Sequence, residues 1–63
     1  MDPEETLQAA RRALAKYRSA EDAGDADAAA DAAWALAANF EALDGWLNRG
    51  GFPPADWAPG RQA

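Results

Sequence analysis

Apolar residues recur with the period of an α-helix through the first third of the chain. Spacings of three and four residues separate Leu7, Ala10, Leu14 and Tyr17, so these side chains share one face of a helix. Charged residues occupy many of the remaining positions. The pattern predicts a first helix over about residues 3–22.

Capping residues mark both ends of this first helix. Asp2 stands in the N-cap position directly before Pro3, and proline is well tolerated in the first helical position. Gly24 suits the left-handed conformation that ends many helices, and Asp25 then caps a second helix. Because a connection of about three residues is so short, we expect the two helices to form an antiparallel hairpin.

The second helix is predicted over about residues 26–49, with Gly45 as an unfavourable residue inside it. Its apolar positions alternate in steps of four and three, as in the contact seam of a coiled coil. This predicted seam consists of Ala29, Ala33, Leu36, Phe40, Leu43 and Leu47. Alanine lies near the turn and the larger residues lie at the open end, so the open end should be wider.

A tail rich in proline and aromatic residues follows over residues 50–63. The wide end of the hairpin would otherwise expose large apolar groups to water. We therefore expect Phe52 and Trp57 to fold back and pack near Trp46 and Leu47.

The composition limits the fold to a single small all-α domain. The chain has 63 residues, and most of its apolar residues are alanine. Thr6 is its only β-branched residue, so a β-sheet has almost nothing to build on. Chains of this size often need a disulfide, a metal or a partner to be stable, and cysteine and histidine are absent. A homodimer in the form of a four-helix bundle is therefore expected.

Trp34 projects away from the predicted seam and has Ala30, Ala37 and Ala38 around it. The tail or a second subunit could cover it, and two-fold pairing is the commonest symmetry of homo-oligomers. The alternative is an exposed aromatic anchor for a partner protein, because tryptophan is enriched in binding hot spots.

The residues offer little for catalysis. Without histidine or cysteine, Ser19 has no usual base to activate it, so we expect no enzyme. Four aspartates cluster around the turn, but their spacing does not match a calcium-binding EF-hand loop. The cluster is better interpreted as helix caps and a solvated face, and we expect no metal or cofactor.

The basic residues of the first helix suggest an alternative, a nucleic-acid-associated regulator. They are Arg11, Arg12, Lys16 and Arg18. Arg11 and Arg18 fall at one edge of the apolar stripe while Arg12 and Lys16 lie opposite it, so they do not form one basic face. A net charge of −5 also disfavours binding to nucleic acid or to anionic membranes.

Several features favour a cytoplasmic protein. The first residues are acidic where a signal peptide would be basic, and no apolar run is long enough to span a membrane. The absence of cysteine fits a reducing compartment.

Residues 40–57 carry a distinctive pattern: Leu-Asp-Gly-Trp-Leu at 43–47 runs into Arg-Gly-Gly-Phe at 49–52, two prolines and Trp57. This segment resembles the C-terminal part of short proteins from actinobacteria and their bacteriophages. The resemblance covers about a third of the chain and brings no catalytic residues with it. It implies a small cytosolic protein of the host or of a phage.

We thus expect a small non-enzymatic interaction or regulatory protein. It would form a homodimer and could bind a further protein partner. The candidate interface residues are Trp34, Phe40, Leu43, Trp46, Leu47, Phe52 and Trp57.

Overall fold

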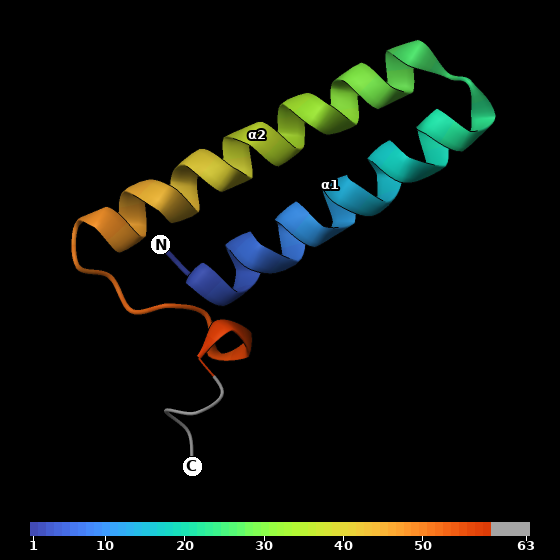
Figure 1. The fold of residues 1–63 in the computed structure, drawn as a ribbon. Coiled ribbons are helices and arrows are strands. Elements are labelled where there is room, and N and C mark those ends of the chain that lie inside the picture. The colour runs from blue at the N-terminus through green and yellow to red at the C-terminus, as the bar shows by residue number, and fades with distance from the viewer. Residues whose placement is uncertain (59–63) are drawn as a thin grey trace.

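The computed structural model describes residues 1–58 and consists of two long helices and one short turn of helix. Helix α1 covers Pro3–Ala23, α2 covers Ala26–Asn48, and the 3-10 helix η1 covers Ala55–Trp57. Figure 1 shows α1 and α2 side by side, with η1 below the N-terminal part of α1. No strand occurs in this part of the chain, so the predicted all-α hairpin is confirmed. The last five residues of the predicted tail, 59–63, lie outside the described residues.

Two aspartates start the two helices. The Asp2 side chain accepts hydrogen bonds from the backbone N–H groups of Glu4 and Glu5, at 3.0 and 3.3 Å. The Asp25 side chain accepts one from the N–H of Ala28 at 3.1 Å. Each cap satisfies backbone donors that the first turn of a helix leaves without partners. The sequence pattern thus places both helix starts correctly.

Gly24 makes the reversal between the helices possible. Its φ of 70° lies in the left-handed region that side chains disfavour. The N–H groups of Gly24 and Asp25 donate to the carbonyls of Glu21 and Ala20, which closes the last turn of α1. Only two residues connect the helices, and α2 therefore returns antiparallel along α1 (Figure 1).

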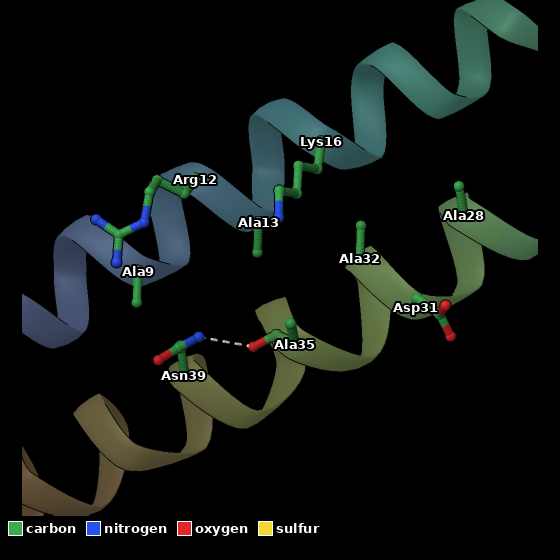
Figure 2. Close-up of a pocket in the computed structure, with 9 residues that line it drawn as sticks. All are labelled: Ala9, Arg12, Ala13, Lys16, Ala28, Asp31, Ala32, Ala35 and Asn39. Carbon is green, nitrogen blue, oxygen red and sulfur yellow. Dashed lines mark hydrogen bonds between the residues drawn. The ribbon is translucent and has the colours of Figure 1, made fainter.

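Alanines form the contact between the helices near the turn, and leucines form it at the open end. Buried alanines come from both helices, and Leu7 and Leu43 are buried farther from the turn. In Figure 2, Ala13 of α1 and Ala32 of α2 point into the space between the helices from opposite sides. Such small side chains allow the two backbones to approach closely. The buried alanines are Ala13, Ala20, Ala29 and Ala32.

The predicted seam of α2 is only partly correct. Ala29 and Leu43 face α1, but Ala33 and Phe40 are exposed, and Ala32 is buried instead. Helix α2 is therefore turned about its axis relative to the prediction. Because Ala32 and Ala33 have identical side chains, the packing of α2 against α1, and not the type of side chain, selects Ala32 for the contact.

The tail reverses direction around the indole of Trp46. The N–H of Gly51 donates to the Trp46 carbonyl at 2.9 Å, and the indole N–H donates to the Phe52 carbonyl at 2.8 Å. The Phe52 ring meets the indole edge to face, with ring centres 5.6 Å apart. The predicted contact between Phe52 and Trp46 is therefore correct.

The second half of the tail attaches to α1. The backbone N–H of Ala55 donates to the Glu4 carboxylate, and Arg11 forms an ion pair with Asp56 at 2.8 Å. Trp57 lines a hollow together with Leu7 of α1 and Leu43 of α2, so it lies against both helices of the hairpin. Leu47 does not line that hollow, and its predicted contact with Trp57 stays a prediction.

The contact between Trp46 and Gly51 yields a first prediction. A methyl group at position 51 would overlap the indole ring, so Gly51→Ala must displace Trp46 or the tail. We expect a loss of about 1–3 kcal/mol, as for other overpacked sites, and a lower melting temperature with altered tryptophan fluorescence. A variant that melts like the wild type would show that the tail does not pack against the indole.

A substitution at Gly45 should change the stability in the opposite direction to Gly51→Ala. A methyl group there would meet only the end of the flexible Arg49 side chain, 3.2 Å away. Because glycine inside a helix costs about 1 kcal/mol relative to alanine, Gly45→Ala should stabilise the protein by up to about that amount. Thermal unfolding followed by circular dichroism measures the change. A lower melting temperature would indicate that Arg49 needs this space.

Candidate functional site

One broad side of the hairpin carries an apolar surface, which we call the apolar face. Two neighbouring hollows, of about 660 and 270 Å³, share Leu14, Leu36 and Phe40 and so form one continuous groove. Phe40 stands in its middle and is 64% exposed. The remaining apolar residues that line the groove are Leu7, Ala10, Tyr17, Ala33, Ala37, Leu43 and Trp57.

Charged residues of opposite sign mark the two edges of the apolar face. Arg11 of α1 lines the hollow near the tail, and Glu41 of α2 lines the larger hollow. Each helix therefore contributes one charged residue to the groove, of opposite sign, and Arg11 is also paired with Asp56.

Tyr17 contributes a polar group to the apolar face. Its hydroxyl donates to the Glu21 carboxylate at 3.1 Å, one helical turn further along α1. This hydrogen bond, together with the negative charge of Glu21, raises the pKa of Tyr17 above its ordinary value. The hydroxyl thus stays protonated, and the ring presents its apolar side to the groove.

The opposite side of the hairpin, which we call the polar face, has a different character. Its hollow of about 440 Å³ is lined by Arg12, Lys16, Asp31 and Asn39 together with alanines (Figure 2). The Asn39 amide donates to the carbonyl of Ala35 within α2 at 2.9 Å. Charges of both signs are present, so this hollow is not a uniform basic surface.

The basic residues considered for nucleic-acid binding do not come together. Arg12 and Lys16 line the polar face, whereas Arg11 lines the apolar face and pairs with Asp56. Arg18 is exposed. Within residues 1–58, these four basic side chains therefore do not form one surface for a phosphate backbone, and the role as a nucleic-acid-associated regulator stays a prediction.

The candidate interface residues occupy three different environments. Leu43 is 3% exposed and belongs to the contact with α1. Trp46 and Phe52 pack against each other at the start of the tail, and Leu47 lies at the exposed end of α2. The structure brings together only Phe40, Leu43 and Trp57 in the groove.

Trp34 is 80% exposed and does not line the groove. The prediction that the tail covers Trp34 is therefore wrong for the described part of the tail, residues 50–58. Coverage by a second subunit stays a prediction, as does the role of an anchor for a partner protein.

Sequence reasoning did not assign Leu14, Tyr17 and Leu36 to an exposed surface. The first two were found as the apolar stripe of the first helix, and Leu36 as part of the seam. The periodicity placed these side chains on the correct side of each helix. It could not show how much of that side the other helix covers. The rotation of α2 leaves the three residues only partly buried.

Comparisons with protein-family models, with curated proteins and with solved structures give no match. The resemblance of residues 40–57 to actinobacterial and phage proteins therefore stays a prediction. Neither helix of the described chain is long and apolar enough to cross a membrane. Within residues 1–58, no group of three or more acidic side chains is arranged to hold a metal ion.

The hydrogen bond of Tyr17 gives a prediction that needs no knowledge of function. Tyr17 is the only tyrosine, so the absorbance change of its ionisation is easily followed in a pH titration. Glu21→Gln removes the carboxylate charge and should move the Tyr17 pKa down toward its ordinary value of about 10. Asp22→Asn is the matched control, because Glu21 is the residue that contacts Tyr17.

The same bond makes a pH-dependent contribution to stability. The folded state raises the pKa, so the contribution is complete below the unfolded value of about 10 and is lost as pH rises through the folded value. If the Tyr17 titration is unchanged in Glu21→Gln, the contact with Glu21 is not the cause of the raised Tyr17 pKa.

Proposed function

We propose that this chain is a small non-enzymatic protein-interaction protein that binds through its apolar face. The observation that carries the proposal is the exposed Phe40 in the middle of a groove between two helices. Contiguous exposed apolar surface with a charged rim is typical of sites where proteins associate.

Two further features support binding of a protein rather than catalysis. The lining of the groove is almost wholly apolar, with the Tyr17 hydroxyl already engaged by Glu21. Histidine and cysteine, the usual proton-transfer and nucleophilic groups, are absent from the sequence. An amphipathic helix would suit this surface, because helices commonly place an apolar side in such a groove.

Photo-crosslinking in cells that produce the protein tests this function. A photoreactive phenylalanine analogue at position 40 should yield covalent protein adducts, whereas the same analogue at Ala42 should not. Both positions are exposed on α2, but Ala42 lies outside the groove. Adducts with nucleic acid, equal yields at both positions, or no adduct at position 40 would contradict the proposal.

A further inference from the structure

The apolar face is one of the two broad sides of the molecule. The protein measures 42 × 24 × 13 Å, so it is a single layer of helices with two broad sides. One partner that covers the apolar face could therefore bury its whole groove.

Both helices contribute apolar residues to this face. Leu14 and Tyr17 come from α1, and Leu36 and Phe40 come from α2. A two-fold pair brings the same surface of two copies together, so a face of this kind can serve as its own partner. The result would be a two-layer, four-helix arrangement with an apolar centre.

The charges of the two helices select the orientation of such a pair. Among the described residues, the charged ones that line the groove are Arg11 of α1 and Glu41 of α2. Arg12, Lys16 and Asp31 line the polar face and do not contribute. Packing α1 against α2 of the other copy brings Arg11 toward Glu41, whereas packing α2 against α2 places the Glu41 edges of the two copies together.

We propose that the occupant of the apolar face is the apolar face of a second copy of this chain. The two-fold axis runs parallel to the helices, so that α1 of each copy lies on α2 of the other. The Arg11 edge of each groove then meets the Glu41 edge of the other. This inference rests on the proposed function, because it names the partner of the same face.

The turns of the two copies lie at the same end in this arrangement. A two-fold axis perpendicular to the helices would put them at opposite ends, separated by about the 42 Å length of the molecule. The two orientations therefore differ in a distance that can be measured directly.

Two neighbouring alanines provide the first test. Ala37 lines the groove, whereas Ala38 is also exposed but does not line it and lies one helical turn from Trp34. Sedimentation equilibrium of the full chain should show a dimer. Ala37→Glu should raise its dissociation constant at least about tenfold by burying an unpaired charge, and Ala38→Glu should leave it nearly unchanged.

Several outcomes would overturn the inference. One is a folded chain that stays at 6.7 kDa at high micromolar concentration. Another is a dimer weakened by Ala38→Glu and not by Ala37→Glu, which would place the interface on the Trp34 side. Circular dichroism on each variant confirms that the helices are intact.

A spin label at the turn provides the second test. The chain has no cysteine, so Ala23→Cys, at an exposed position, gives a single attachment site. Pulsed dipolar spectroscopy on the labelled dimer should give a distance well below half the length of the molecule. A distance near 42 Å between the two labels would contradict a two-fold axis that runs parallel to the helices.

The two proposals can fail separately. A monomer that still forms adducts with another protein through position 40 would overturn the proposal that the partner is a second copy. It would leave the proposed interaction function intact. A dimer unaffected by Ala37→Glu, together with no adduct at position 40, would overturn both.

Discussion

The close contact between alanines of α1 and α2 is the interaction on which the rest of this structure depends. Ala13 and Ala20 on one helix and Ala29 and Ala32 on the other are buried because the backbones approach each other closely. Small side chains fill the space between the two helices near the turn, and the smallest dimension of the molecule is 13 Å. Each helix can therefore cover only one narrow stripe of the other, and larger apolar residues beside that stripe stay exposed.

The tail compensates for this thin core only at the open end. Trp46, with Gly51 beneath its indole, turns the chain, and Pro54 becomes fully buried. The Glu4 and Arg11 side chains then hold η1 against α1. The exposed Arg11–Asp56 pair alone contributes little, because exposed ion pairs are worth about 0–1 kcal/mol. Burial of Pro54 and the indole contact must therefore provide most of the attachment, while the ion pair sets its direction.

The parts of the fold that follow from local chemistry could be predicted from the sequence. Asp2, Gly24 and Asp25 determine the starts of the helices and the turn through contacts within a few residues. The rotation of α2 could not be predicted, because Ala32 and Ala33 have identical side chains and only the three-dimensional contact chooses between them. The direction of the tail could not be predicted either, since Arg11 and Asp56 are 45 residues apart in the chain.

The candidate site escaped prediction for the same reason. A periodic stripe such as Leu14 and Tyr17 shows which side of a helix is apolar, but not how much of it a thin neighbour covers. Alanine gives each helix a narrow contact surface, so that it covers little of the other helix. Alanine also favours helix formation, because it has the highest intrinsic helix propensity. The same residue that lets a short chain form two long helices thus leaves Phe40 and Leu36 without a full cover. Stable helices and an incomplete core among residues 1–58 are thus consequences of one composition.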